Sequence, residues 1–437
     1  MWWARWAPST FCTSKSAARA GPEWFWCASA WRWWRAVDVA TLTLLLQILL
    51  GVAALGTLTS TIFLGLTIAG AIRFHRDARK AKAALPALDA MPAVSVLKPV
   101  HGAEAQLKEN LESFFQQDYP AYEILIAADE ADDAALPIAR EVSARYPNIP
   151  CRILVTGKTP WLNPPAYSFY RMTEVAAHEI LVTSDSDVEV APNYLHEVVA
   201  PLLDAKTGMV TCVYRGKNVT GWWSGMTAIG MSVEMTAGVL VANILEGINF
   251  GLGPTIAVKK DAVAKIGGYE TLGEYFANDY AIGNLIDKAG YRVVLSHHII
   301  DHVVSQKNFR QMWRSQLRWA TSTRHSRPKG HFGSGLIFAI PFGILGFAAA
   351  APLGRIDLGW LLFGAACANR ALESWSIGWG IVRDPVALQR PWFYPIRDLL
   401  GFFVWVASYL AAGAEWRSSS YKLSRDKIVV RTNRKKA

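Results

Sequence analysis

Long apolar runs flank a central segment in which strand and helix patterns alternate. The first run carries no Asp, Glu, Lys or Arg from Val39 to Ile72, whereas a transmembrane helix needs only about 20 apolar residues. A secretory signal peptide is the alternative, but its apolar core would measure about 7–15 residues and end at a small-residue cleavage site. We therefore expect a transmembrane helix over residues 37–73.

Basic residues lie on both sides of this run. RFHRDARKAK (73–82) follows it, and the positive-inside rule places such a segment in the cytoplasm. Residues 1–36 form a lead that is rich in Trp and Arg. Two interpretations of the lead stay open: an interfacial amphipathic segment, and upstream sequence from a misassigned start.

Residues 92–330 have the pattern of a soluble α/β domain. AVSVLKPV (93–100) and YEILIAADE (122–130) are typical of buried strands, and an amphipathic helix pattern separates them. Because strands and helices continue to alternate, we predict a parallel sheet with helices on both faces. Ligands gather at the carboxyl ends of the strands in such sheets, which is where Asp129 and Asp185 fall.

Apolar runs return after residue 330 and predict C-terminal membrane helices within residues 331–416. The runs cover residues 336–353, 358–381 and 399–414. Arg370 and Glu373 lie inside the second run, and ionisable residues in a span usually face other helices or a cavity. Residues 417–437 are a basic tail that we expect in the cytoplasm. Since an even number of crossings must then separate domain and tail, we expect the third run to be re-entrant or interfacial.

Composition excludes several protein classes. Hydrophobic residues make up 52% of the chain and charged residues 18%, a balance too apolar for intrinsic disorder. The five cysteines are widely spread, without the spacing of a disulfide-stapled module or a zinc finger. The net charge of +10 comes mostly from basic residues beside apolar runs. The predicted partner is therefore a lipid bilayer with an anionic face, and not nucleic acid.

The sharpest local candidate for chemistry is Asp185-Ser186-Asp187 at the end of an apolar strand. Two carboxylates one residue apart can share a hard divalent cation, which in turn bridges the phosphates of a nucleotide. A solvated acidic turn or a helix cap is the alternative. A second acidic cluster follows another strand and consists of Asp129, Glu130, Asp132 and Asp133. An ordinary solvated loop is the alternative there.

Two later elements supply further candidates. Asp279 opens an amphipathic helix after the aromatic turn in GEYFANDYAIGNLI, where it is either a charge favoured by the helix dipole or a general base. RSQLRWATSTRHSRP places Arg314 and Arg318 on one helix face beside Trp319. Arginine suits phosphate and tryptophan suits stacking. A basic juxtamembrane helix on lipid headgroups is the alternative.

Other familiar sites find little support. His297, His298 and His302 lie on and just after a predicted strand, with no thiolate or second cluster to complete a zinc site. GLGPT lacks the spacing of a phosphate-binding or dinucleotide loop, and the sequence has no GxSxG elbow.

Seven motifs follow one another along the chain: VSVLKPVHG, NLESFFQQDYPAYEILIAADEADDAA, DSD, GGYETLGEYFANDY, RSQLRW, PIRDLLGFFVWV and EWRSSSYKL. This ordered set resembles inverting, processive-type glycosyltransferases with a GT-A fold, and more closely the ceramide glucosyltransferase family. The likeness covers about residues 92–330 and continues weakly through the C-terminal runs. It implies an α/β fold, a GT-A nucleotide-diphospho-sugar transferase domain, flanked by transmembrane helices.

The resemblance implies roles for the matching acidic residues. Asp129 corresponds to the acid near the uracil of the donor, with Asp132 as the reserve because the register is ambiguous by a residue. Asp185 corresponds to the second acid of the nucleotide-sugar site, and Asp187 completes the pair that would hold Mg²⁺ or Mn²⁺. Asp279 matches the catalytic base.

The RSQLRW element is the implied acceptor end of the site. Arg318 and Trp319 match its last two positions. Ser315 stands at its first position, so the polar role falls to Arg314 or Gln316.

The implied reaction moves a hexose from a UDP-sugar, with UDP-glucose as the expected donor, to the hydroxyl of a ceramide-like membrane lipid. A hopanoid or polyprenyl-phosphate acceptor stays open as an alternative. So does an inactive membrane scaffold with a degenerate transferase domain, because Ser315 departs from the family pattern and Pro165 stands where the family has a cation. The expected protein is an integral, multi-pass membrane enzyme with a cytoplasmic catalytic domain.

Overall fold

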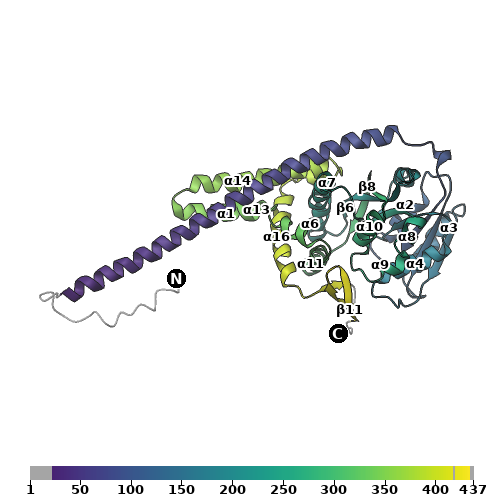
Figure 1. The fold of residues 1–437 in the computed structure, drawn as a ribbon. Coiled ribbons are helices and arrows are strands. Elements are labelled where there is room, and N and C mark those ends of the chain that lie inside the picture. The colour runs from purple at the N-terminus through teal and green to yellow at the C-terminus, as the bar shows by residue number, and fades with distance from the viewer. Residues whose placement is uncertain (1–21, 417–418, 434–437) are drawn as a thin grey trace.

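The computed structural model describes residues 22–416 and 419–433 (Figure 1). Its longest element is helix α1 (Pro22–Ala83), which continues from the Trp-rich lead through the apolar run into the basic segment. Residues 1–21 of the predicted lead lie outside the described residues. The predicted boundary between residues 36 and 37 falls inside this continuous helix.

Two helical segments of the described chain are long and apolar enough to cross a membrane, Val39–Ala83 and Trp222–Leu245. Burial covers 17% of the apolar window in the first and 61% in the second. The second segment consists of α6 (Trp222–Ile229), the π-helix η3 (Gly230–Met235) and α7 (Thr236–Leu245). Its burial is that of a core helix, whereas α1 exposes large apolar side chains such as Leu45 and Ile62.

An eight-stranded sheet forms the centre of the domain, in the order β3-β2-β1-β4-β7-β6-β8-β5. Its strands are β1 (Val94–Pro99), β2 (Tyr122–Ala128), β3 (Cys151–Val155), β4 (Ile180–Ser184), β5 (Val188–Glu189), β6 (Thr207–Asn218), β7 (Thr255–Lys259) and β8 (Arg292–Val304). The predicted α/β class is confirmed. The expectation of a wholly parallel sheet is wrong, because β7 runs antiparallel to β4 and β6, and β5 runs antiparallel to β8. Helices α6 and α7 between β6 and β7 pack against α16 and α1, and so do not form an ordinary crossover.

Helices cover both faces of the sheet, as predicted. On β2, Ile124 and Ile126 face one apolar layer, and Leu125 and Ala127 face the other. The first layer receives α2 (Leu107–Phe115), α3 (Ala135–Arg145) and α5 (Tyr194–Val199). The second receives α4 (Pro164–Val175), α8 (Lys260–Lys265), α9 (Gly268–Leu272) and α10 (Asn278–Lys288). Short 3₁₀ turns lie at η1 (Leu88–Ala90) and η2 (Ala200–Leu203).

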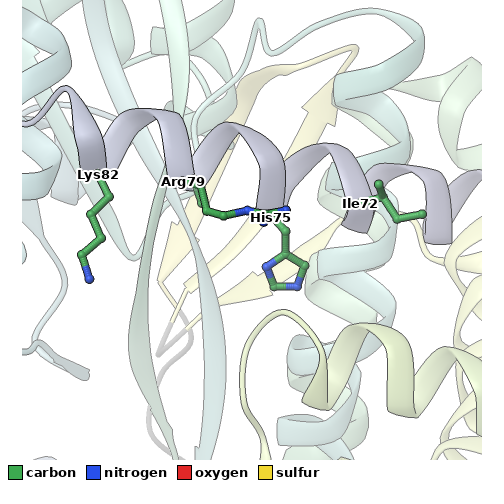
Figure 2. Close-up of a pocket in the computed structure, with 5 residues that line it drawn as sticks. Ile72, His75, Arg79 and Lys82 are labelled. Carbon is green, nitrogen blue, oxygen red and sulfur yellow. The ribbon is translucent and has the colours of Figure 1, made fainter.

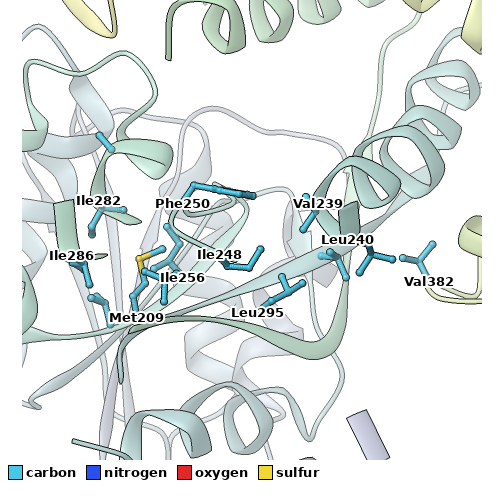
Figure 3. Packing of buried hydrophobic residues seen from close by; sticks show 14 of the residues in the cluster. Met209, Val239, Leu240, Ile248, Phe250, Ile256, Ile282, Ile286, Leu295 and Val382 are labelled. Atoms are coloured by element: carbon cyan, nitrogen blue, oxygen red, sulfur yellow. The ribbon is translucent and has the colours of Figure 1, made fainter. Parts of the chain in front are cut away.

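The second layer is continuous with the packing around α1. Figure 3 shows strand residues such as Met209 and Ile256 near Phe250, with Leu240 of α7 in the same cluster. Phe63 and Phe74 of α1 belong to this cluster too. The long helix is therefore packed into the domain core at its C-terminal part.

A basic stripe follows the apolar part of α1. Figure 2 shows Ile72, His75, Arg79 and Lys82 on one side of the helix, where they line a shallow pocket together with Ala78. Their spacing of three and four residues puts them on one helical face. Part of the collar predicted from RFHRDARKAK thus forms one face of the same helix.

The chain after β8 is helical up to Leu410, and its apolar runs form a helical hairpin and a further helix. The elements are α11 (Phe309–Ser326), α12 (Pro328–Ser334), α13 (Ile340–Ala350), η4 (Ala351–Leu353), α14 (Ile356–Glu373), the π-helix η5 (Ser374–Trp379), α15 (Pro385–Gln389) and α16 (Phe393–Leu410). Helices α13 and α14 pack on each other and along α1 (Figure 1). Leu50 of α1 contacts the hairpin residues Ala349 and Leu362 in one small apolar cluster.

The segment predicted as a basic tail contains two strands. Strands β9 (Ala414–Trp416), β10 (Ser419–Ser424) and β11 (Lys427–Asn433) form a separate three-stranded sheet. Ile428 N–H donates to Glu274 O at 2.8 Å, and Tyr421 packs on Phe276 with ring centroids 5.2 Å apart. This C-terminal sheet therefore lies against the aromatic turn that precedes α10.

Candidate active site

One cavity of about 1050 Å³ brings together the candidate residues from distant parts of the sequence. Its walls include Asp129 after β2 and Asp185 after β4, so it opens at the carboxyl ends of parallel strands. The predicted residues that line it are Asp129, Asp185, Asp187, Asp279, Gln316, Arg318 and Trp319. The cavity continues between α11 and the C-terminal helices, where Arg397 lines it. The carboxyl ends of the sheet strands and the C-terminal helices thus line one space.

The Asp185–Asp187 turn is fixed by its backbone. Asp185 N–H donates to Pro254 O at 3.1 Å, and the ammonium of Lys98 donates to Asp185 O. Burial, reinforced by the charge of Asp187, raises the pKa of Asp185 to about 7, although His302 and Lys98 act in the opposite direction. Burial also lowers the pKa of Lys98 to about 7, against the pull of the nearby carboxylates. The turn is half-buried and its carboxylates interact with Lys98 and His302, so it is not a solvated acidic loop.

His302 is the site residue that sequence reasoning assigned to no function. Its Nε2 lies 3.1 Å from Asp187 Oδ2, and the adjacent Val303 N–H donates to Asp187 O at 2.8 Å. Burial alone would raise the pKa of Asp187, but the charge and hydrogen bond of His302 outweigh it and lower that pKa. The spacing of His302 along its strand could not reveal this contact, because Asp187 lies 115 positions away.

Buried atoms of Asp187 and His302 that lack hydrogen-bond partners bear on whether a divalent cation fits the site. Asp187 Oδ1 and His302 Nδ1 are buried without a hydrogen-bond partner in the described part of the chain. Hard cations such as Mg²⁺ prefer carboxylate oxygens, and Asp185 and Asp187 both line the cavity. Within the described ranges, no three His, Cys, Asp or Glu side chains already converge as a complete ligand set. The residues fit a cation that is held mainly by two carboxylates and completed by other oxygen ligands.

The second acidic cluster divides into different environments. Asp129 is partly buried in the cavity wall, with Oδ1 3.5 Å from the hydroxyls of Thr156 and Ser168. Asp132 is exposed and does not line the cavity. Asp133 accepts hydrogen bonds from Gly102 N–H and Ala135 N–H at 2.7 and 2.8 Å, and so closes a turn. Of the two alternatives in the ambiguous register, only Asp129 reaches the cavity.

Asp279 stands at the start of α10 with its carboxylate in the cavity. Burial raises its pKa, against hydrogen bonds from the backbone of Tyr280 and Gly253 and the charge of Arg318. A Cβ added to Gly253 would lie 2.8 Å from Asp279 Oδ2, so glycine there leaves room for the carboxylate. A carboxylate with a raised pKa in a cleft is a candidate general base as well as a helix-terminal charge.

Helix α11 places three predicted residues on the cavity wall. Gln316 is buried, and its Oε1 accepts a hydrogen bond from Arg397 Nη2 at 2.7 Å. The Arg318 guanidinium lies 5.5 Å from the Trp319 ring centroid and 6.0 Å from that of Trp416. Arg314 is exposed and does not line the cavity. Between the two alternatives for the polar position, only Gln316 can face a ligand there.

Pro165 also lines the cavity, in the first turn of α4. Proline suits this position because the first helical N–H groups lack intrahelical partners. The preceding Asn163 caps the helix, accepting from Ala166 N–H at 3.3 Å and donating to Tyr275 O at 2.6 Å. Pro165, which departs from the family pattern, therefore lies in the first turn of a helix beside the site. A cation is present elsewhere in the cavity wall, because Arg318 lines it and its charge acts on both Asp279 and His302.

Comparison with known proteins shows where the chain belongs. The model of the family described as Glycosyl transferase family 21 matches residues 57–429, which is most of the chain. The chain belongs to glycosyl transferase family 21. The predicted resemblance and the predicted enzyme class, a glycosyltransferase, are confirmed. The family match runs from α1 into β11 and so includes the C-terminal helices.

Relatives of this family 21 chain carry ceramide glucosyltransferase names. Ceramide glucosyltransferase 1 of Caenorhabditis elegans is 24% identical over 344 residues, which cover 76% of this chain and 72% of the relative. The ceramide glucosyltransferase of Candida albicans is 30% identical over 125 residues, covering 25% of this chain and 22% of the relative.

Solved structures of other glycosyltransferases are similar at low identity. A mannosyltransferase from Pyrobaculum calidifontis, in complex with GDP-Man and Mn²⁺, is 17% identical, with a TM-score of 0.44 and coverage of 82% of this chain and 99% of that one. Glucosyl-3-phosphoglycerate synthase from Mycobacterium tuberculosis is 18% identical, with a TM-score of 0.37, covering 55% of this chain and 81% of that one.

Proposed function

We propose that this family 21 chain is a membrane-associated inverting glycosyltransferase that moves glucose from UDP-glucose to the hydroxyl of a ceramide-like lipid. The observation that carries the proposal is the single cavity. It has Asp185, Asp187 and Asp279 on its walls and extends to Arg397 on the C-terminal helices. The names of the relatives support the choice of sugar and lipid.

Asp279 is the proposed base. Its carboxylate takes the proton of the acceptor hydroxyl while that oxygen attacks the anomeric carbon, and the bond from this carbon to the UDP oxygen breaks on the opposite face. Inversion at the anomeric carbon follows. Burial raises the pKa of Asp279 towards neutral pH, where a general base is most effective.

Asp185 and Asp187 are the proposed holders of the cation, and His302 fixes the orientation of Asp187. A bound Mg²⁺ or Mn²⁺ would neutralise charge that develops on the departing diphosphate. Asp129 is proposed to contact the base of the nucleotide. Arg318 supplies a positive charge beside Asp279 and His302, where the phosphates of the donor would lie.

Gln316 and Trp319 are proposed to face the acceptor. Both line the cavity from α11, the helix that leads towards the C-terminal helices. Trp319 packs with Tyr214 and Met231, so its ring gives that wall an apolar surface. Such a wall suits a lipid that carries a reactive hydroxyl at one end.

We also propose that the protein is a multi-pass membrane protein with its catalytic domain in the cytoplasm. Helix α14 has 18 residues, which rise about 27 Å, close to the roughly 30 Å of a bilayer core. Packed along α1, the α13–α14 hairpin would cross and return, with α13 and η4 (Ile340–Leu353) as its shorter arm. The C-terminal sheet contacts the domain at Glu274, so the domain and the sheet share one side. The basic stripe of Arg79 and Lys82 fits the cytoplasmic face.

The experiment that tests the function uses the purified chain in lipid nanodiscs. UDP-glucose, UDP-galactose and UDP-GlcNAc are each offered with C6-ceramide, a hopanoid alcohol or undecaprenyl phosphate, with and without Mn²⁺. Mass spectrometry of the lipids should show hexosyl-ceramide from UDP-glucose only when the cation is present. Transfer to another lipid would replace the acceptor proposal, and retention of the anomeric configuration would contradict the mechanism.

A further inference from the structure

Arg397 is a buried arginine that the proposed chemistry does not use. Its side chain is 8% exposed and belongs to α16, where it lines the cavity. Its Nη2 donates to Gln316 Oε1 at 2.7 Å and lies 2.9 Å from Glu234 Oε2. Its Nε and Nη1 have no hydrogen-bond partner among the described residues. Since burying unmet donors is costly, a hydrogen-bond acceptor supplied from the cavity would stabilise this guanidinium.

Arg370 is a nearby buried arginine whose contacts hold helices together, and it serves as a comparison for Arg397. Arg370 contacts Asn369 Oδ1 at 2.7 Å and Glu373 Oε2 at 2.8 Å, and it also contacts Asp398 Oδ1 at 3.3 Å. Asp398 Oδ2 in turn accepts from the backbone N–H of Ile340 at 2.8 Å, at the start of α13. These contacts join α14, α16 and α13. Arg397 joins α16 to α11 and η3 through Nη2 alone, so these contacts do not account for its Nε and Nη1, which have no partner among the described residues.

The surroundings of Arg397 are shaped around its guanidinium, at the wall of the cavity. A Cβ added to Gly230 would lie 2.3 Å from Arg397 Nε, and one added to Gly401 would lie 3.2 Å from Nη1. Glycine on two separate helices therefore makes room for the guanidinium. Glu234 lies in the π-helix η3 that begins at Gly230, and π-helical turns in α-helices occur frequently at functional sites.

Glu234 lies beside Arg397 and offers a hydrogen-bond acceptor where Arg397 offers donors. Its side chain is 35% exposed and lines the cavity, and its Oε2 has no hydrogen-bond partner of acceptable geometry in the described ranges. A carboxylate accepts from O–H and N–H groups, whereas the free N–H groups of Arg397 donate to oxygen. The two side chains together present donors and an acceptor to the same space.

We propose that Arg397 and Glu234 form the subsite that holds the polar headgroup of the acceptor lipid, and that this subsite takes an uncharged headgroup with both hydroxyl or N–H donors and a carbonyl or hydroxyl acceptor. The proposal rests on the proposed lipid glycosyltransferase function. An N-acyl amino alcohol has this chemistry. In the described cluster, the carboxylates of Glu234, Glu373 and Asp398 offset the guanidinium groups of Arg370 and Arg397, so a phosphate headgroup meets no surplus of positive charge at this subsite.

The experiment measures lipid binding and turnover separately for Arg397→Lys and Glu234→Gln. The Lys variant keeps the positive charge but loses the planar fork of donors, and the Gln variant keeps the shape but loses the charge. Binding of tritiated C6-ceramide to nanodisc-embedded protein, and KM for C6-ceramide, should both weaken at least tenfold in each variant. The dissociation constant of UDP and the slow hydrolysis of UDP-glucose without acceptor should stay within twofold.

Arg390→Gln is the matched control, because Arg390 is exposed, precedes the same helix and lies outside the cavity. Its acceptor KM should equal that of the wild type. Ceramide binding without any turnover in the wild type would reject the glycosyltransferase proposal and leave the subsite standing. Normal ceramide binding in both folded variants, or equally tight binding of undecaprenyl phosphate by the wild type, would overturn the subsite. If the Lys variant does not fold, as judged by its melting temperature, Glu234→Gln alone decides.

Discussion

His302 Nε2 lies 3.1 Å from Asp187 Oδ2, so strand β8 supports the acidic turn that follows β4. The pairing of β5 with β8 sets this distance, because Val188 and His302 are register partners. A donor on the imidazole holds the carboxylate in one orientation. Residues that orient a metal ligand in this way contribute to cation affinity without being charged ligands themselves.

His302→Gln should weaken Mn²⁺-dependent binding of UDP by about 10–100-fold, the usual cost of losing a group that orients a metal ligand. Asp187→Asn should weaken it further, because it removes a charged ligand. Titration calorimetry with UDP and Mn²⁺ measures both effects. Asp132→Asn is the control, since Asp132 is exposed outside the cavity. Unchanged UDP affinity in the Asp187 variant would remove this turn from the cation site.

Asp279→Asn should lower kcat by roughly 10²–10⁴-fold, the usual contribution of general base catalysis. UDP affinity should change little, because the proton transfer occurs only in the transition state. The measurement is kcat with saturating lipid, together with the dissociation constant of UDP. A helix-terminal charge without a catalytic role predicts nearly normal turnover, so such a result would exclude Asp279 as the base.

The acid limb of the kcat profile should lie at higher pH than an exposed aspartate would give. Burial raises the pKa of Asp279, and the base works only when ionised, so activity falls as pH drops through that raised pKa. The charge of Arg318 lowers the pKa of Asp279. Arg318→Gln should therefore move the limb to still higher pH. Arg314→Gln, on the exposed face of the same helix, should leave it in place, and a common shift in both variants would contradict the local effect.

Cysteine labelling should show that the tip of the α13–α14 hairpin is on the far side of the membrane. Arg355 lies at the tip and Arg425 in the C-terminal sheet, and both are exposed. In a chain whose native cysteines are replaced, an impermeant maleimide added to sealed cytoplasm-out vesicles should modify Arg425→Cys. Arg355→Cys should react only after permeabilisation. Immediate labelling at both positions would mean that the hairpin does not cross.

Local patterns determined much of this protein before its structure was considered. Apolar length predicted the helix around Val39–Ile72, and strand–helix alternation predicted an α/β domain with acids at strand ends. These features depend on neighbours in the chain, because burial of a strand or a helix face leaves its period in the sequence. The ordered motifs also carried the family resemblance, which the match over residues 57–429 confirmed.

Only the tertiary structure decided which polar residues meet. Asp129 and Asp132 look equivalent in sequence, yet one lines the cavity and the other is exposed. His302 reaches Asp187 across 115 positions, and Arg397 reaches Gln316 across 81. Sheet register and helix crossing set such contacts, and neither leaves a local pattern. The basic C-terminal segment is a further case, because its strands are stabilised by packing on the turn before Asp279, which the charge of the segment did not indicate.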